Sequence, residues 1–443
     1  MYSSFAPLIS EIEDISPLER RGHVTATHGG LVDVSGLSSF ARVGDLVEMN
    51  GPDGVAPAEI LSLSEGIARV LPAAGPRGTA IGDVVRYIGD GHIRPDISWV
   101  GRVIDAYGRP LDGRPMAKGP DKRSVLASPP EATSRRRLGP RVETGLAAFN
   151  TFLPIVRGQR IGLFAGSGVG KSTLLAQLAQ SVAADFIVIA LIGERGREVR
   201  EFIEDTLGAD GLARSVVVAA TSDQSPVARR RASWTAMAVA EYLRDQGGHV
   251  LFLADSVTRF CEAHREIALS TGEPAGAQGY PASTAQQVMS LCERAGTGPQ
   301  DKGDITAIFS VLVAGSDMDE PVADMVRGVL DGHVILDRNI AERGRFPAID
   351  ILRSVSRSFT KAHNAEAQDI IAAARTQMSV YAQSELMIQA GLYKPGADAA
   401  IDQSIRLRPK FESFLSGSAQ PKNQSGAHDL ARLAEILTDT ASK

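Results

Sequence analysis

A glycine-rich turn that ends in a lysine and a hydroxyl residue is the stretch of this sequence best suited to phosphate chemistry. It follows the short apolar run 161–164, which predicts a buried strand, and it precedes a stretch where Leu174 and Leu178 share the inward face of a helix. A strand, a glycine-rich turn, Gly-Lys-Ser and a helix in this order predict a phosphate-binding loop. The residues of the predicted loop are Gly166, Ser167, Gly168, Val169, Gly170, Lys171, Ser172 and Thr173.

Each residue type in this loop has a role in binding a nucleoside triphosphate. The glycines let successive backbone N–H groups curl around phosphate oxygens, and the start of the following helix adds partial positive charge. Lys171 is expected to reach the β- and γ-phosphates, and the Ser172 hydroxyl to ligate Mg²⁺. The sequence therefore predicts ATP and Mg²⁺ as cofactors, although Ala165 stands where the usual pattern has its first glycine.

Two acidic residues follow predicted strands and could complete the site. Asp255 comes directly after the apolar run 249–254, where it could hold Mg²⁺ directly or through water. Glu194 comes after the apolar run 186–191, where it could orient and polarise the water that attacks the γ-phosphorus. Ligands of a parallel sheet sit at the carboxyl ends of its strands, so we expect both carboxylates beside the phosphate loop.

Composition excludes several other classes of protein. The 443 residues include 47 Lys and Arg and 52 Asp and Glu, and the net charge of −5 provides no global basic field for nucleic acid or an anionic membrane. The two cysteines, Cys261 and Cys292, give no disulfide framework and fit a reducing compartment. Residues 1–10 lack the features of a signal peptide, and no apolar run approaches the length of a membrane span. We expect a soluble cytoplasmic protein.

The N-terminal part of the chain predicts a docking segment and a barrel. Residues 1–21 have the pattern of one amphipathic helix, which either packs on its own domain or docks a partner. From 22 to 92, alternating apolar residues and regular glycine and proline turns indicate a small β-barrel with a role in assembly. The predicted barrel strands are 23–26, 31–34, 45–49, 58–61 and 67–71.

Alternating strands and helices predict a mostly parallel sheet, with helices on both faces, inside a connector and catalytic region at 93–358. Residues 359–416 turn helical and are expected to form a C-terminal bundle, with helices at 361–390 and 398–416. Residues 417–443 combine a polar linker with an amphipathic helix that either folds back on the bundle or binds a partner. The predicted strands of the sheet are 161–164, 186–191, 215–220, 249–254, 305–313 and 333–336.

Taken together, the motifs resemble a known family over about residues 22–415. The chain is similar to the flagellar and type III secretion export ATPases, which are relatives of the catalytic subunit of rotary ATP synthases. The matching segments are 101–105, 144–146, the phosphate loop, 193–199, 220–223, 255–260, 272–274, 279–281, 324–328, 331–333 and 354–357. The sequence departs from the family at Ala314–Asp317, where acidic residues are usual, and at 282–287, which lacks the usual second proline and bulky apolar residues. Both departures concern details of the ring.

The resemblance implies roles for residues of the catalytic region. Glu194 matches the catalytic carboxylate of the family, and Arg195 and Arg259 match arginines that organise the phosphate site. Arg357 matches an arginine finger that a neighbouring subunit inserts, and Phe346 stands where relatives place an aromatic ring against adenine. The family fold is a small β-barrel, a RecA-like core and a helical C-terminal domain, assembled as a hexameric ring.

The function that the resemblance implies is hydrolysis of Mg-ATP at the subunit interfaces of a homohexamer, which energises protein export. Flagellar export is expected first, and virulence type III secretion is the alternative. The implied partners are a regulatory or stator-like component at the N-terminus, an export gate, and exported substrates or their chaperones. The protein would reach the cytoplasmic face of the inner membrane only through these partners, and no nucleic acid is expected.

Two rival function classes can be weighed on the same sequence. A non-catalytic, nucleotide-binding ring subunit would carry Gln at the catalytic position, and Glu194 argues against that class. A Rho-like RNA translocase would need a barrel with exposed aromatics, and residues 22–92 offer only Phe40 and Tyr87. The basic run 135–137 has no aromatics between its arginines, which favours a solvated or inter-subunit charge cluster over a nucleic-acid patch.

Overall fold

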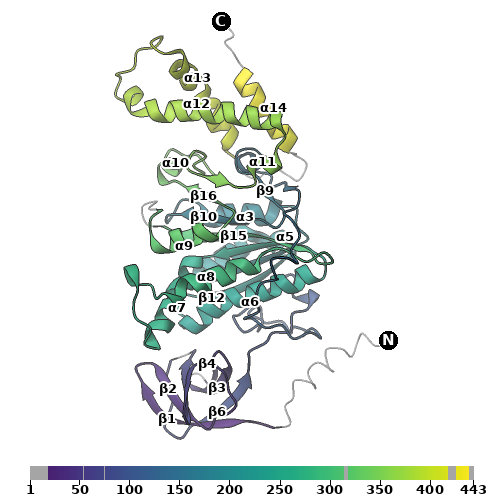
Figure 1. Cartoon of the computed structure of the whole chain (residues 1–443), viewed down its shortest axis with the longest axis vertical. Helices are drawn as coiled ribbons and strands as arrows, with labels where there is room; N and C mark the ends of the chain where they lie inside the picture. Colours follow the sequence, from purple (N-terminus) through teal and green to yellow (C-terminus); the bar gives the residue numbers. More distant parts are fainter. Residues whose placement is uncertain (1–17, 53, 74, 314–317, 418–425, 439–443) are drawn as a thin grey trace.

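The computed structural model describes residues 18–438 except for 53, 74, 314–317 and 418–425. A β-barrel, an α/β sheet and a group of long helices are stacked in that order along the long axis (Figure 1). This is the predicted fold class, a small N-terminal barrel, a RecA-like centre and a helical C-terminal part. Nearly all of the predicted helix at 1–21, the departure at 314–317 and most of the predicted polar linker lie outside the described residues.

Six antiparallel strands close the barrel in the order β1-β2-β5-β4-β3-β6. Alternate residues such as Val24, Val34 and Val70 fill its interior. The sequence predicted five of the six strands but missed β6, because Val84 and Ile88 face solvent and obscure the period of two. The strands are β1 (Arg21–His28), β2 (Leu31–Ser35), β3 (Leu46–Gly51), β4 (Gly54–Ser64), β5 (Ile67–Pro72) and β6 (Val84–Gly89).

The central sheet has the order β17-β16-β10-β15-β13-β11-β12-β7, with β14 paired to β15. All strands run parallel except β14 and β17, which are antiparallel to their neighbours. The six predicted strands are present, and the three that the sequence missed have only two or three residues each. The strands are β7 (Arg102–Ile104), β10 (Arg160–Ala165), β11 (Phe186–Glu194), β12 (Ser215–Thr221), β13 (His249–Asp255), β14 (Gly296–Thr297), β15 (Asp304–Leu312), β16 (Gly332–Leu336) and β17 (Val355–Ser356).

Helices cover both faces of this sheet, as predicted. In β13, Val250 and Phe252 pack into one core, and Leu251 and Leu253 pack into the other. The first core is shared with α6 (Pro226–Asp245), α7 (Val257–Ser270), α8 (Ser283–Arg294) and α9 (Pro321–Val329). The second is shared with α2 (Ala147–Asn150), α3 (Lys171–Ser181), the π-helical turn η3 (Phe202–Leu207) and the C-terminal helices. The remaining short elements are η2 (Ile97–Trp99), β8 (Arg141–Val142), β9 (Ile155–Val156), α4 (Gly196–Glu201), α5 (Gly208–Leu212), η4 (Ala277–Gly279), α10 (Arg338–Glu342) and α11 (Phe359–Ala362).

Two of the three arginines in the basic run bind within their own chain. Arg135 donates to the carbonyl of Ala295 at 2.9 Å, and Arg136 donates to the buried carboxylate of Asp304 at 2.7 Å. Arg136 is exposed, as a solvated cluster requires, while it also binds Asp304, whereas Arg135 is largely withdrawn from water. Asp304, at the start of β15, needs basic partners because it is removed from water.

The C-terminal part consists of α12 (Ala365–Gln389), α13 (Ala399–Leu415) and α14 (Gly426–Thr438). The last of these folds back on the chain, which is one of the two alternatives for the tail. Leu433 is fully buried in the second core, and Asn150 of α2 donates to Asp429 of α14 at 2.8 Å.

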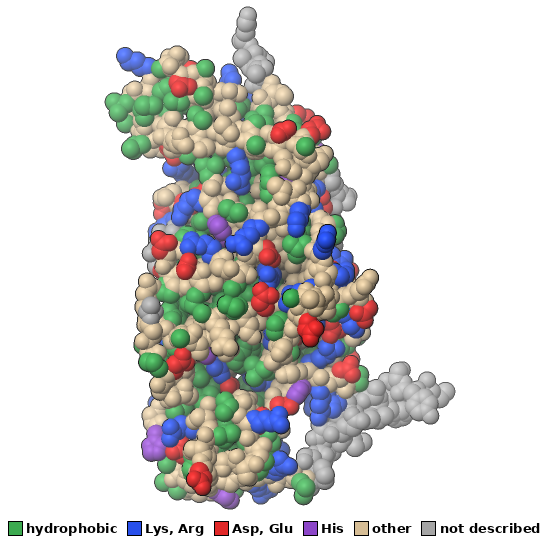
Figure 2. All heavy atoms as spheres, viewed as in Figure 1, with side chains coloured by type: hydrophobic (Ala, Val, Ile, Leu, Met, Phe, Trp, Pro, Cys, Tyr) green, Lys and Arg blue, Asp and Glu red, His purple; other side chains and the backbone are tan. Residues whose placement is uncertain are grey.

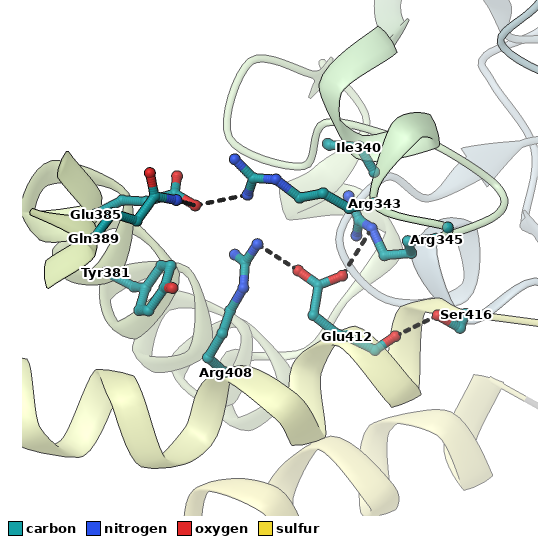
Figure 3. Close-up of a pocket in the computed structure, with 10 residues that line it drawn as sticks. Ile340, Arg343, Arg345, Tyr381, Glu385, Gln389, Arg408, Glu412 and Ser416 are labelled. Carbon is teal, nitrogen blue, oxygen red and sulfur yellow. Dashed lines mark hydrogen bonds and ion pairs between the residues drawn. The ribbon is translucent and has the colours of Figure 1, made fainter.

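Ion pairs fasten the C-terminal helices to the catalytic domain around a cavity of about 390 Å³ (Figure 3). Arg343 donates to Glu385 at 2.6 Å, and the two sides meet again where Arg345 lies 3.1 Å from Glu412. Arg408 of α13 also pairs with Glu412, at 2.7 Å. Each of the three arginines has a carboxylate partner, and these pairs join the two parts, so this cavity is a structural joint between them.

Candidate active site

The predicted phosphate loop leaves the carboxyl end of β10, which lies between β16 and β15 in the sheet. Gly168 and Gly170 have φ of +77° and +87°, a left-handed conformation that glycine adopts without a Cβ penalty. Gly170 caps α3, which begins at Lys171. Ala165 ends β10 in ordinary strand conformation, so the missing first glycine leaves the turn intact. The backbone of the loop and the start of α3 therefore have the conformation that a phosphate-binding site needs.

One lysine and two carboxylates meet at this edge of the sheet. Asp255 ends β13 and Glu194 ends β11, and both strands point the same way as β10. The Lys171 ammonium contacts Asp255, and its Nζ lies 3.8 Å from Oε1 of Glu194. Asp255 is buried, whereas Lys171 and Glu194 are partly buried. The fold thus brings three predicted site residues from three elements into one corner.

The environment of Glu194 favours its protonated form more than water would. Burial raises the pKa of Glu194, the positive charge of Lys171 opposes that shift, and Asp255 and Glu198 add to it. A carboxylate with a raised pKa is a stronger base. The direction of the shift therefore suits a group that polarises a water molecule.

The residues predicted to hold Mg²⁺ offer suitable oxygen atoms. Ser172 and Asp255 line the same cavity of about 180 Å³, together with Glu194. Ser310 of β15 donates to Asp255 at 2.8 Å and fixes one carboxylate oxygen. Across the described residues, no cluster of three or more His, Cys, Asp or Glu could hold a metal ion unaided. Mg²⁺ at nucleotide sites takes one or two protein oxygens and completes its shell with phosphate and water, so the pair fits this ion.

Arg195 and Arg259 both line a larger cleft of about 1430 Å³. The phosphate loop and Glu194 line the same cleft. Arg195 is mostly exposed and donates to Glu198 at 2.6 Å. Arg259 donates to Glu262 at 2.8 Å. Its aliphatic part packs on Gly193, where φ is +69° and a Cβ would lie only 3.0 Å from the Arg259 side chain. Glycine at 193 therefore lets Arg259 lie beside the end of β11.

The aromatic ring of Phe346 lies next to the phosphate loop. A Cβ placed on Gly170 would be 3.4 Å from Cδ1 of Phe346, so the ring borders the start of α3. The side chain is 49% exposed, which is unusual for a phenylalanine with no partner to cover it. Its backbone carbonyl accepts a hydrogen bond from Gly417 at 2.9 Å, which ties this turn to the end of α13.

Arg357 is the one predicted site residue that the fold keeps away from the phosphate loop. After Phe346, the chain runs back along β16, pairing Ile349 with Leu336 and then Val355 with His333. The amide of Arg357 donates to the carbonyl of Asp331, just before β16 begins. From residue 331 to residue 336 the strand spans about 17 Å, which is longer than an arginine side chain. Arg357 is exposed at the opposite edge of the sheet.

Two residues of the corner escaped the prediction. Ser310 holds Asp255, and Glu198 hydrogen-bonds to Glu194 and raises its pKa. Ser310 is one of two hydroxyl residues, with Thr306, in the otherwise apolar stretch 305–313, and this was a usable signal because a buried hydroxyl needs a partner. Glu198 lies inside the motif 193–199. Its spacing from Glu194 does not indicate which of the two carboxylates would activate the attacking water.

Comparison with known proteins identifies the family. Residues 145–356 match the ATP synthase alpha/beta family, nucleotide-binding domain, and residues 363–430 match the T3SS EscN ATPase C-terminal domain. A flagellum-specific ATP synthase of Caulobacter vibrioides is 45% identical over 440 residues, which cover 97% of this chain and 98% of the relative. This chain belongs to the flagellar and type III secretion ATPases of that family.

Other relatives of this ATPase are nearly as similar. A type 3 secretion system ATPase of Pseudomonas savastanoi pv. phaseolicola is 40% identical, over 92% of this chain and 91% of the relative. The solved structure of the assembled ATPase EscN in complex with its central stalk EscO, from enteropathogenic E. coli, is 37% identical, with a TM-score of 0.85 over 94% of this chain and all of that one. The predicted resemblance, the fold class and an ATPase activity are thereby confirmed. In the described part of this ATPase, no helix has the length and apolar character of a membrane span.

Proposed function

We propose that this ATPase hydrolyses Mg-ATP at the interfaces of a homohexameric ring and that hydrolysis promotes the unfolding and export of proteins. The observation that supports hydrolysis is the corner where Lys171 and Asp255 stand beside Glu194. Lys171 would bind the phosphates, and Asp255 with Ser172 would hold Mg²⁺, which neutralises developing phosphate charge when bound. Glu194 would accept a hydrogen bond from the attacking water and direct it at phosphorus. Arg195 and Arg259 would line the approach to the phosphates, and Phe346 would cover the adenine ring.

The proposed ring rests on the position of Arg357. A transition state at the phosphate loop gathers negative charge, and an arginine fork is well matched to it. Arg357 lies at the far edge of its own sheet, so a second copy of the chain would have to supply it. The relative EscN is described as an assembled ATPase with a central stalk, which supports a ring and a stalk-like partner for this chain.

The proposed export role follows the named relatives. The Caulobacter relative is a flagellar protein and is 45% identical, against 40% for the secretion relative, which supports flagellar export before virulence secretion. We assign residues 1–21 to docking of a regulatory or stator-like component and 22–92 to ring assembly. Residues 93–358 would be the connector and ATPase domain, 359–416 would form the C-terminal helical domain, and 417–443 would be a linker and an amphipathic tail. An export gate and exported proteins or chaperones would be further partners at the cytoplasmic face of the inner membrane.

The rival classes have less support. A non-catalytic ring subunit has no use for an acid with a raised pKa at Glu194. An RNA translocase would need stacking platforms on the barrel. Phe40 and Tyr87 instead pack edge to face with their ring centroids 5.2 Å apart, and the Tyr87 hydroxyl donates to Asp45 at 2.6 Å.

Separating chemistry from binding tests this proposal. Glu194→Gln keeps the shape of the side chain and removes its charge, so Mg-ATP affinity should stay near wild type while turnover falls about 10²–10⁴-fold. Lys171→Ala should instead weaken ATP binding. Glu204→Gln, an exposed acid on the neighbouring turn, is the matched control and should hydrolyse ATP normally. A Glu194→Gln protein with near-normal turnover would contradict the assignment.

A further inference from the structure

A second cleft, of about 520 Å³, lies where the barrel meets the catalytic domain, and it shares no lining residue with the nucleotide cleft. Strands β3 and β6 form one wall, and the loops around 90–94 and 107–109, with Arg231 of α6, form the other. Its size is that of a small-molecule site, and junctions between domains are common places for such sites. In Figure 2, basic side chains lie at this junction together with acidic side chains and histidine.

The lining of this junction cleft is strongly basic. Among the described residues, the acidic residues that line it are Glu48 and Asp90. Glu48 pairs with Arg86 and lies 3.7 Å from Arg109, and Asp90 contacts the His92 ring. The basic lining residues are Arg86, Arg94, Arg109, Lys118, Lys122 and Arg231. Basic side chains therefore outnumber acidic ones along this lining, and walls of low dielectric constant strengthen the field of charges that line a cleft.

Arg231 is the most unusual of these cations. It is only 3% exposed, and no carboxylate among the described residues forms an ion pair with it, although the charges of Glu59 and Asp105 oppose the lowering of its pKa by burial. Its guanidinium donates to the carbonyl of Gly91, while its Nε has no hydrogen-bond partner among the described residues. Gly91 has φ of +61°, and a Cβ there would lie 2.7 Å from Nη2 of Arg231, so the glycine makes room for the guanidinium. A buried cation of this kind calls for an anion.

A second polar group beside Arg231 also lacks a partner. The Arg231 Cζ lies 5.4 Å from the ring centroid of Tyr107, whose buried hydroxyl has no hydrogen-bond partner among the described residues. Burial raises the pKa of Tyr107, so its hydroxyl remains a donor. The apolar ring of Trp99 completes the inner wall, with its N–H already given to Ala117 at 2.6 Å. The inner end of the cleft thus holds unused donors beside an aromatic surface.

We propose that the junction cleft binds a small polyvalent anion that carries phosphate or carboxylate groups. The Arg231 guanidinium and the Tyr107 hydroxyl would anchor the anion, since an arginine fork and a hydroxyl donor match the oxygens of either group. The exposed Lys118 and Lys122 would attract it at the rim. The bound anion would accept the hydrogen bonds that the Arg231 Nε and the Tyr107 hydroxyl leave unused.

The test uses the full chain with Lys171→Ala, so that the phosphate loop no longer competes for the probe. Pyrophosphate and citrate are titrated separately by calorimetry in 0.15 M salt, roughly physiological ionic strength. We expect one of them to bind once per chain and to slow the acylation of Lys118 and Lys122, measured by mass spectrometry. Binding of pyrophosphate would identify phosphate as the recognised group, and binding of citrate would identify carboxylate.

Two variants show whether the binding belongs to this cleft. Arg231→Gln should lower the affinity at least about tenfold, whereas Arg338→Gln, which removes the same charge from an exposed position, should leave it unchanged. If Arg231→Gln does not fold, the surface pair Lys118→Ala and Lys122→Ala decides, and it should lower the affinity several-fold. Failure of both anions to bind would overturn the proposal. Unchanged affinity in a folded Arg231→Gln protein would also overturn it. If Arg231→Gln does not fold, unchanged affinity in the double lysine variant would overturn it instead.

Discussion

The two edges of the central sheet carry the separate groups that we propose form one active site. At the carboxyl edge, Lys171, Glu194 and Asp255 are packed together and partly withdrawn from water. At the amino edge, Arg357 is exposed. One edge holds the groups that we propose bind phosphate and direct water, and the other holds the arginine that we propose stabilises developing charge.

One short segment, from Phe346 to Arg357, contributes a residue to each of these two edges. The chain from Phe346 to Arg357 crosses the sheet beside β16, so the proposed adenine-covering ring and the proposed arginine finger stand at opposite ends of a single return path. In a ring of identical chains, the amino edge of one copy can complete the carboxyl edge of the next. Substitutions at the two edges should therefore affect different steps.

The largest effect is expected at the amino edge. Arg357→Ala should lower turnover about 10³–10⁵-fold, because it removes a charge that acts only in the transition state, and it should leave the Kd for Mg-ATP near wild type. Arg357→Lys should remain strongly impaired, since an ammonium cannot bridge two phosphate oxygens as a fork does. Single-turnover hydrolysis and nucleotide titration measure the two quantities.

The control for this substitution is Arg338→Ala, which removes an exposed arginine whose ion pair among the described residues is with Glu342 on its own helix. It should leave turnover unchanged. If Arg357→Ala weakened ATP binding and turnover by the same factor, Arg357 would contribute to ground-state binding, and the contrast between the two edges would be lost.

A smaller effect, on binding alone, is expected at the carboxyl edge. Phe346→Ala should weaken ATP affinity about tenfold, since stacking of an aromatic ring on a base contributes on the order of 1–3 kcal/mol. Affinity for tripolyphosphate, which has no base, should not change. Phe346→Tyr keeps the ring and should bind ATP normally. Equal affinity losses for ATP and tripolyphosphate would mean that Phe346 supports the phosphate loop through Gly170.

The smallest effect is a shift in pH dependence. Because burial raises the pKa of Glu194, activity should fall as pH drops through a value above the ordinary glutamate pKa of about 4.3. Glu198 adds to that shift through its hydrogen bond and charge, so Glu198→Gln should move the acid limb of the rate profile to lower pH. Glu204→Gln should leave the limb in place. An acid limb that does not respond to Glu198→Gln would argue against Glu194 as the titrating group.

Sequence reasoning succeeded where a motif is local. The phosphate loop, Asp255 and Glu194 each follow an apolar strand, so the topology of a parallel sheet was enough to predict their meeting. It failed where contacts join distant segments, as between Ser310 and Asp255, or between Arg136 and Asp304. It also missed β6, because the apolar residues of that strand face both the barrel interior and solvent. It missed β17 because that strand has only two residues. The junction cleft depends on Gly91, Tyr107 and Arg231, which no spacing rule connects.

The most direct test of the shared site is a mixing experiment with two inactive variants. Rings assembled from both Arg357→Ala and Glu194→Gln chains contain some interfaces in which an intact Glu194 faces an intact Arg357. We predict that such verified mixed rings recover part of the ATPase activity that neither variant shows alone. Mixed rings that stay as inactive as the separate variants, or full activity of a verified wild-type monomer, would contradict a site completed by two chains.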